Sequence, residues 1–202
     1  MKNTKKALVL ILCLVVSFAI LSCGSGGKPA DTGPKDPVHG IWEFTANDDA
    51  NDRGTSTIVM TVAEEVIDGE TFTTYHFKGV VTNATQYGVV DATMTPDEET
   101  LDILKAARAI SFKMLADGRN YVIEAPISTV TDWGFHRYTI KTEPGVVQEH
   151  MIDMRFFMQP AWASPVRFNR DRLTRIRIQT VNAAEGGMGP FEFKVWDVTL
   201  YP

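Results

Sequence analysis

Aromatic side chains beside turns are the residues of this sequence best suited to bind a ligand. Tyr87, Trp133, Phe135 and Trp162 lie in or next to turn-forming stretches. A flat ring can pack against the C–H face of a pyranose, while the sugar hydroxyls need paired polar groups at the ring edge. These positions are therefore candidates for sugar contacts, although most aromatic residues of a β domain belong to its core.

Polar side chains recur at every second position in two of the expected strands. In one, Arg175, Arg177 and Gln179 share a face, and the isoleucines between them point the other way. In the other, His136 and Tyr138 share a face. Arginine and glutamine can donate to hydroxyls or to a carboxylate. The alternative is a solvated sheet face with ordinary cross-strand pairs.

An acidic stretch, residues 47–54, supplies the hard oxygen donors that calcium prefers. Asp48, Asp49 and Asp52 are its carboxylates. The spacing is not that of an EF-hand loop, and a solvated turn explains the same composition.

Other familiar chemistries lack a local signal. The four histidines are scattered without His-x-His or His-Glu-x-x-His spacing, and there is no Gly-x-Ser-x-Gly elbow. The glycine-rich residues 185–189 precede a strand rather than a helix, so they indicate a turn and not a phosphate loop. With 20 basic and 25 acidic residues the net charge is −5, which argues against a nucleic-acid partner.

The pattern of the first 22 residues is typical of a secretion signal. Lysines precede an apolar run, residues 7–21, that is too short for a membrane span. The run ends in Leu-Ser-Cys-Gly, which resembles a bacterial lipobox. The resemblance implies cleavage before Cys23 and acylation of its thiol, with palmitate among the chains. An ordinary signal with a chance cysteine and an uncleaved anchor are the alternatives. Gly24 in place of an aspartate favours the outer membrane, where there are two.

A flexible tether and one domain follow the signal. Residues 23–37 are rich in Gly, Pro, Ser, Asp and Lys, and the domain is expected over residues 38–202. Removing the signal removes three lysines, which leaves 17 basic and 25 acidic residues and a net charge of −8. Cys23 is then the one remaining thiol, so the folded domain has neither a disulfide nor a cysteine nucleophile.

Alternating apolar residues between turns predict an all-β domain. The clearest strands are expected at residues 56–62, 73–81, 87–93, 109–114, 121–127, 136–142, 150–156, 173–180 and 191–200. One short helix is expected over residues 96–108, with Thr95 as its cap and Pro96 in its first position. Helices between successive strands are missing, so we expect a two-sheet antiparallel jelly-roll sandwich and not a parallel α/β fold.

The order of features resembles a known group of jelly rolls. Residues 107–113 lead through an Asp-Gly hairpin, residues 117–121, to Tyr138. The stretches at residues 154–157 and 173–178 follow, and residues 189–198 close the domain. This order is similar to that of carbohydrate-binding module family eleven and of the complex I intermediate-associated protein 30 family, both galactose-binding-domain-like. The closing strand of these families has two adjacent aspartates. Asp197 matches the second of them, whereas Trp196 occupies the position of the first.

The resemblance implies a concave sheet face that holds a ligand, on which we place His136, Tyr138, Arg177 and Gln179. It also offers Asp197 as a distant ligand of a structural calcium ion. The expected function is non-catalytic carbohydrate binding by a lipid-anchored protein of the bacterial cell envelope. A protein-interaction or assembly module for an envelope partner is the alternative, and a hydrolase would need two carboxylates facing each other across a cleft.

Overall fold

The computed structural model describes residues 36–85 and 88–202. The predicted signal, Cys23, nearly all of the predicted tether and Tyr87 lie outside these ranges. Within them, no helix is long and apolar enough to span a membrane.

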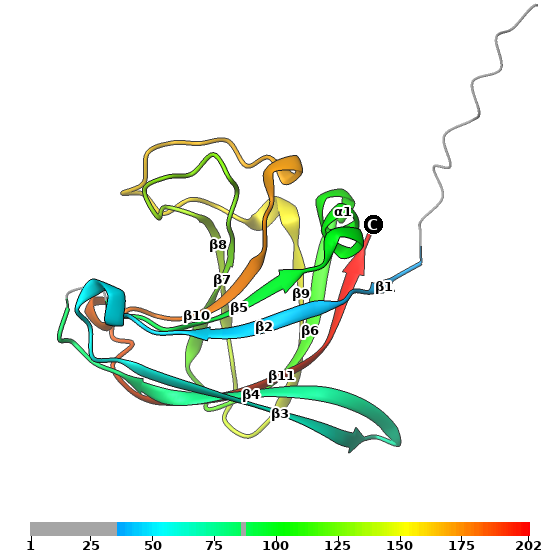
Figure 1. Cartoon of the computed structure of the whole chain (residues 1–202), viewed down its shortest axis with the longest axis horizontal. Coiled ribbons are helices and arrows are strands. Elements are labelled where there is room, and N and C mark those ends of the chain that lie inside the picture. The colour runs from blue at the N-terminus through cyan, green and yellow to red at the C-terminus, as the bar shows by residue number, and fades with distance from the viewer. Residues whose placement is uncertain (1–35, 86–87) are drawn as a thin grey trace, which may run out of the picture. The chain divides into compact units, whose positions relative to one another are not determined.

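Two antiparallel sheets form the domain (Figure 1). The six-stranded sheet has the order β3-β4-β11-β6-β9, with β1 added to β11. Its strands are β1 (Val38–His39), β3 (Thr57–Ile67), β4 (Glu70–Val81), β6 (Ala109–Ala116), β9 (Val147–Asp153) and β11 (Gly189–Tyr201). The five-stranded sheet has the order β2-β5-β10-β7-β8. Its strands are β2 (Trp42–Asn47), β5 (Asp91–Pro96), β7 (Asn120–Ala125), β8 (His136–Lys141) and β10 (Ile176–Thr180). The two-sheet antiparallel architecture predicted from the sequence is thus confirmed.

The core lies between the two sheets. Tyr121 on β7 meets Phe193 on β11 edge to face, with ring centroids 5.0 Å apart. Phe44 on β2 lies 6.3 Å from Phe77 on β4. Since side chains alternate along a strand, each buried row leaves a second row on the outer face of its sheet.

One α-helix and four short 3₁₀ turns connect the strands in the described ranges: α1 (Glu98–Ala106), η1 (Ala50–Asp52), η2 (Met154–Phe156), η3 (Arg170–Arg172) and η4 (Ala183–Glu185). The helix begins later than predicted, because Asp97 rather than Thr95 caps it and accepts the Thr100 N–H at 2.9 Å. Pro96 ends β5 instead of opening the helix. Hydrogen bonds from Thr100 hold the pKa of Asp97 below its usual value.

All nine expected strands are present with shifted ends, and two were not expected. β1 has only two residues, and β2 lies just before the acidic stretch, where Phe44 is the one fully buried side chain of six residues. Such a strand gives a weak alternating signal. The turn Asp68-Gly69 between β3 and β4 has positive φ at both residues, 53° and 87°, which favours this dipeptide.

Candidate functional site

The outer face of the five-stranded sheet carries an ordered row of polar side chains across three strands. Arg177 on β10 lies opposite Thr93 on β5 and Glu124 on β7. Gln179, two residues further along β10, lies opposite Asp91 on β5. The isoleucines on either side of Arg177 are fully buried in the core. Arg177 and Gln179 therefore share the outer face, as the alternation in the sequence predicts.

Arg177 joins two carboxylates that are almost completely covered. Its Nη2 lies 2.5 Å from Oδ2 of Asp91, and its Nη1 lies 3.1 Å from Oε2 of Glu124. The Arg177 side chain is 11% exposed and each carboxylate is 7% exposed. Asn47 completes the group, since its Nδ2 donates to Asp91 and to the Thr93 hydroxyl, both at 3.1 Å. We call Asn47, Asp91, Thr93, Glu124 and Arg177 the polar network.

The protonation of the polar network follows from its burial. Loss of solvation raises the pKa of Glu124 to about 7, although the positive charge of Arg177 acts in the opposite direction. Burial alone would lower the pKa of Arg177, but the hydrogen bond to Asp91 and the charges of Asp91 and Glu124 raise it. The neighbouring Arg175 has a lowered pKa, because of burial and the charge of Arg177. The network therefore holds a firmly charged arginine beside a glutamate that takes up a proton near neutrality.

Two loops lie beside the polar network and are joined to each other by hydrogen bonds. Residues 126–135 follow β7, and residues 157–169 follow η2; the two loops lie together above β7 and β8 in Figure 1. Asp132 accepts the N–H groups of Gly134 at 3.0 Å and of Ser164 at 2.7 Å, and these bonds lower its pKa. From the other loop, Gln159 donates to the Gly134 carbonyl at 2.7 Å.

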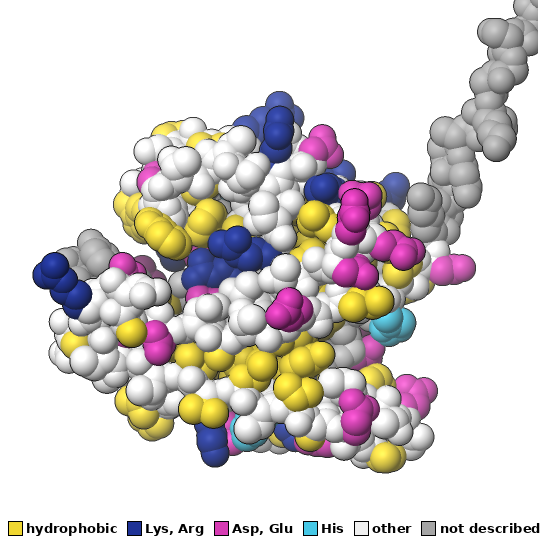
Figure 2. All heavy atoms as spheres, in the orientation of Figure 1, with side chains coloured by type: hydrophobic (Ala, Val, Ile, Leu, Met, Phe, Trp, Pro, Cys, Tyr) yellow, Lys and Arg dark blue, Asp and Glu magenta, His cyan; other side chains and the backbone are white. Residues whose placement is uncertain are grey.

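This pair of loops presents aromatic side chains next to Arg177. The Phe135 ring is buried, and its centroid lies 6.0 Å from the Arg177 guanidinium. Trp133 meets Phe135 edge to face, with centroids 6.2 Å apart, and is 72% exposed. Trp162, from the second loop, is 64% exposed. Figure 2 shows basic side chains over β5 and β10 in a depression, with hydrophobic side chains of the loops on its upper side.

His136 and Tyr138 do not share the face of Arg177, so that prediction is wrong. Arg137 lies opposite Glu124, which in turn lies opposite Arg177, so Arg137 and not its two neighbours in β8 is on the outer face. His136 is buried against Phe168, with centroids 4.9 Å apart, and burial lowers its pKa. Tyr138 lies opposite the core residue Ile123 and is partly exposed at this edge strand. Alternation shows which residues of one strand share a face, but only the pairing between strands shows which face that is.

The four aspartates proposed for calcium do not come together. Asp49 is buried and accepts the backbone N–H of Ser56 at 2.9 Å and its hydroxyl at 2.7 Å. Asp48 accepts the Ala50 N–H through its side chain at 3.0 Å, and Asp52 lies exposed within η1. In the six-stranded sheet, Asp197 pairs with Lys113 at 2.9 Å and His39 at 3.3 Å. No three His, Cys, Asp or Glu side chains of residues 36–85 and 88–202 are placed to hold a metal ion.

The sequence reasoning missed Asn47, Asp91, Glu124 and Arg137. Glu124 carried a usable signal, since it is the one acidic residue in the apolar strand residues 121–125. A charged residue inside such a strand needs a partner of opposite charge. Asp91 opens its strand and offers no comparable signal.

Two antiparallel sheets in this order, with a polar outer face beside aromatic loops, define a galactose-binding-like jelly roll. The family model of complex I intermediate-associated protein 30 matches residues 36–195, and the chain belongs to this family. No curated protein matches the sequence significantly.

Several solved structures are similar to this chain, and the first of those named here shows the same fold. The family 11 carbohydrate-binding module of the cellulosomal cellulase Lic26A-Cel5E of Clostridium thermocellum is 12% identical, with a TM-score of 0.52 over 81% of this chain and 88% of that chain. An exo-β-agarase is 10% identical, with a TM-score of 0.46 over 82% of this chain and 26% of that one. A variant of the family 29 module CBM29-2 is 10% identical, with a TM-score of 0.35 over 78% and 91%.

Proposed function

We propose that this domain binds carbohydrate on the outer face of its five-stranded sheet. The observation that carries the proposal is an exposed tryptophan, Trp133, beside a buried polar network, with a second exposed tryptophan, Trp162, on the neighbouring loop. Trp133 contacts Phe135, and the ring of Phe135 in turn lies beside the guanidinium of Arg177. Trp162 precedes Ala163, which packs against Gly134. An apolar ring face beside fixed hydrogen-bonding groups suits a sugar, which has an apolar side and a polar rim.

The arrangement of the carboxylates favours binding over hydrolysis. A glycosidase needs two carboxyl groups on opposite sides of the scissile bond, about 5–10 Å apart. Asp91 and Glu124 both contact Arg177, which lies between them. The arginine fills the space that a substrate would need, so the proposed role is non-catalytic. The named carbohydrate-binding module with the same fold supports this assignment.

Glycan-array screening and calorimetry on the compact unit Pro34–Pro202 test the proposal. We expect binding of at least one neutral oligosaccharide, and about tenfold weaker binding or more after Trp133→Ala or Trp162→Ala. Phe156→Ala is the matched control, because this aromatic residue is also exposed but lies in η2. The absence of binding to every glycan, or an equal loss in all three variants, would remove the proposal.

A protein-interaction module is the second candidate, and strand β3 favours it. β3 has 11 residues, pairs with β4 on one side and forms the outer edge of its sheet within the described residues. Val59, Val62 and Val66 on this strand are exposed. A long apolar edge strand can pair with a strand of another chain. Crosslinking in cells should then recover a partner that Val62→Lys loses and Trp133→Ala keeps, whereas the sugar proposal predicts no such dependence.

We also propose that the chain is a lipoprotein attached to the bacterial envelope through Cys23. The basic start, the apolar run and the Leu-Ser-Cys-Gly sequence support it. Mass spectrometry of the mature protein should find Cys23 as an acylated first residue. Cys23→Ser should leave the chain unacylated and release it from the membrane fraction, and an unmodified wild-type cysteine would contradict the proposal.

A further inference from the structure

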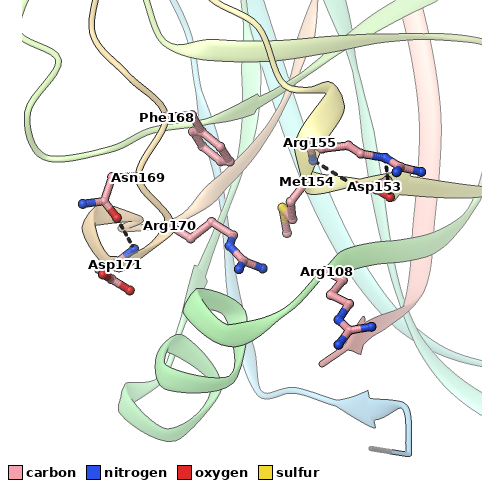
Figure 3. Close-up of a pocket in the computed structure, with 8 residues that line it drawn as sticks. All are labelled: Arg108, Asp153, Met154, Arg155, Phe168, Asn169, Arg170 and Asp171. Carbon is pink, nitrogen blue, oxygen red and sulfur yellow. Dashed lines mark hydrogen bonds and ion pairs between the residues drawn. The ribbon is translucent and has the colours of Figure 1, made fainter. Parts of the chain in front are cut away.

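A pocket lies away from the polar network, where α1 ends. Its volume is about 550 Å³, and its walls come from the start of β6, from η2 and from residues 168–171 (Figure 3). None of the residues of the polar network lines it, and the loop of residues 157–169 contributes only its last two residues, Phe168 and Asn169. A space of this size is in the range of small-molecule sites and far exceeds what a single inorganic ion needs.

Two arginines point into this pocket from opposite sides. Arg170 comes from η3, and its Nη1 donates to the carbonyl oxygens of Ala106 and Ala107 at the end of α1. Arg108 comes from the residue before β6. Its backbone N–H donates to the Tyr201 carbonyl, and its own carbonyl accepts the Met154 N–H, both at 2.7 Å. Both side chains thus start from firmly held backbone, and the Arg170 guanidinium is itself anchored.

Nearby carboxylates do not neutralise these two arginines. Asp153 pairs with Arg155 at 3.0 Å and also accepts the Arg155 N–H at 2.9 Å. Figure 3 shows the Asp171 side chain on the far side of η3, away from the pocket. No ion pair to Arg108 or Arg170 forms within the described part of the chain. Two guanidinium groups without an acidic partner create a site for an oxyanion.

Part of the remaining wall is apolar, formed by Phe168 and Met154. Phe168 is partly buried and stacks on Phe157, with centroids 6.0 Å apart, and Met154 is buried beside it. An inorganic phosphate ion gains no favourable contact from an aromatic ring, whereas the ring of a sugar packs against one. The pocket therefore combines a contact for a ring with a contact for an anion.

We propose that this pocket binds an acidic sugar unit, with the carboxylate of a hexuronate between Arg108 and Arg170 and the sugar ring against Phe168. The site is separate from the outer face and does not depend on carbohydrate binding there.

Calorimetric titration of the unit Pro34–Pro202 at low salt tests the proposal. The probes are galacturonate, the neutral methyl galactoside and inorganic phosphate. We expect galacturonate to bind more tightly than either of the others, by about tenfold or more. Equal binding of the neutral sugar would overturn the role of the arginines, and equal binding of phosphate would overturn the assignment to a sugar. A failure of all three probes to bind would overturn the whole proposal.

Substitutions locate the site. Arg108→Gln removes an exposed arginine and should weaken galacturonate binding about tenfold or more, while Arg170→Lys keeps the charge but loses the fork that grips a carboxylate. Arg167→Gln is the matched control, since Arg167 is exposed but does not line the pocket. Trp133→Ala should leave galacturonate binding unchanged. An equal loss with Arg108→Gln and Arg167→Gln would show a general charge effect and overturn the site.

Discussion

Charged pairs on the outer faces of the two sheets differ in how well they are covered. On the five-stranded sheet, Arg177 and its two carboxylates are almost fully shielded beside the loops that carry Phe135. On the six-stranded sheet, Lys194 pairs with Glu65 at 2.6 Å, with side chains 22% and 36% exposed. His76 pairs with Glu192 at 2.7 Å and is similarly open to solvent. The distances are alike, so the surroundings and not the pairing make the difference.

Burial from solvent changes how much a charge pair contributes to stability and how firmly its side chains are held. In water, an exposed pair gains little because the solvent screens it, and its net contribution is about 0–1 kcal/mol. A covered pair depends on its partner, since the loss of one member leaves an unpaired charge in a poorly solvated place. Such groups are also held in one position, as a binding site requires. The polar network therefore suits recognition, whereas the pairs on the six-stranded sheet serve as a solvated surface.

Removal of Arg177 should have the largest effect on stability. Arg177→Leu leaves Asp91 buried without its cation, and we expect the free energy of unfolding to fall by about 3–5 kcal/mol. Urea denaturation at pH 8, above the pKa of about 7 of Glu124 in the wild type, measures it. The double variant with Asp91→Asn should recover part of the loss. A loss below about 1 kcal/mol would mean that the network is as solvated as the exposed pairs.

Stability should also depend on pH through Glu124. Its pKa is about 7 in the folded protein against 4.5 as the ordinary value, so the folded state binds this proton more tightly than the unfolded state. The stabilisation is therefore complete below about pH 4.5 and is lost as the pH rises through 7. The pKa difference corresponds to about 3 kcal/mol.

Glu124→Gln isolates this effect, because glutamine cannot ionise. The unfolding free energy of the wild type, minus that of the variant, should fall by about 3 kcal/mol between pH 4.5 and 8. Lys194→Gln and Glu65→Gln should show no comparable change over this interval. A difference that stays constant with pH would place the Glu124 carboxylate in solvent.

The contact between the two loops can also be disturbed by a substitution, and this should affect the outer face of the five-stranded sheet. A Cβ at Gly134 would lie 2.2 Å from the Cβ of Ala163 in the other loop. Gly134→Ala should therefore separate the loops, lower the unfolding free energy by about 1–3 kcal/mol and weaken sugar binding. Ala163→Gly in the same chain makes room and should restore both. An unchanged calorimetric titration for Gly134→Ala would show that the loop contact does not position Trp133.

Much of the fold could be predicted from the sequence, because strands with one buried side alternate visibly. Ile176 and Ile178 around Arg177 are the clearest case, and both are fully buried. The turn at Asp68-Gly69 has positive φ at both positions, because this dipeptide tolerates such backbone. Both signals are local, so a single sequence contains them.

The site was harder to predict, because it depends on pairing between distant strands. Asp91 meets Arg177 across 86 positions of the chain, and no local pattern connects them. His136 and Tyr138 were assigned to the wrong face, because a shift of one position in strand pairing moves every side chain to the other face. Asp197 resembles a metal ligand in sequence, but in the structure it pairs with Lys113. In each case the missing information was the register of one strand against another.

We expect the smallest effect on the free energy of unfolding at the exposed pair of Lys194 and Glu65 on the six-stranded sheet. Lys194 donates two hydrogen bonds to Glu65, at 2.6 and 2.8 Å, and this pair is geometrically better than the contact of Arg177 with Glu124. Geometry alone would therefore rank Lys194 as the more important residue. Because water can solvate Glu65 once the lysine is gone, we expect Lys194→Met to lower the unfolding free energy by less than about 1 kcal/mol. Urea denaturation in low and high salt checks this, and a loss as large as that of Arg177→Leu would show that hydrogen-bond geometry, and not covering, separates the two sheets.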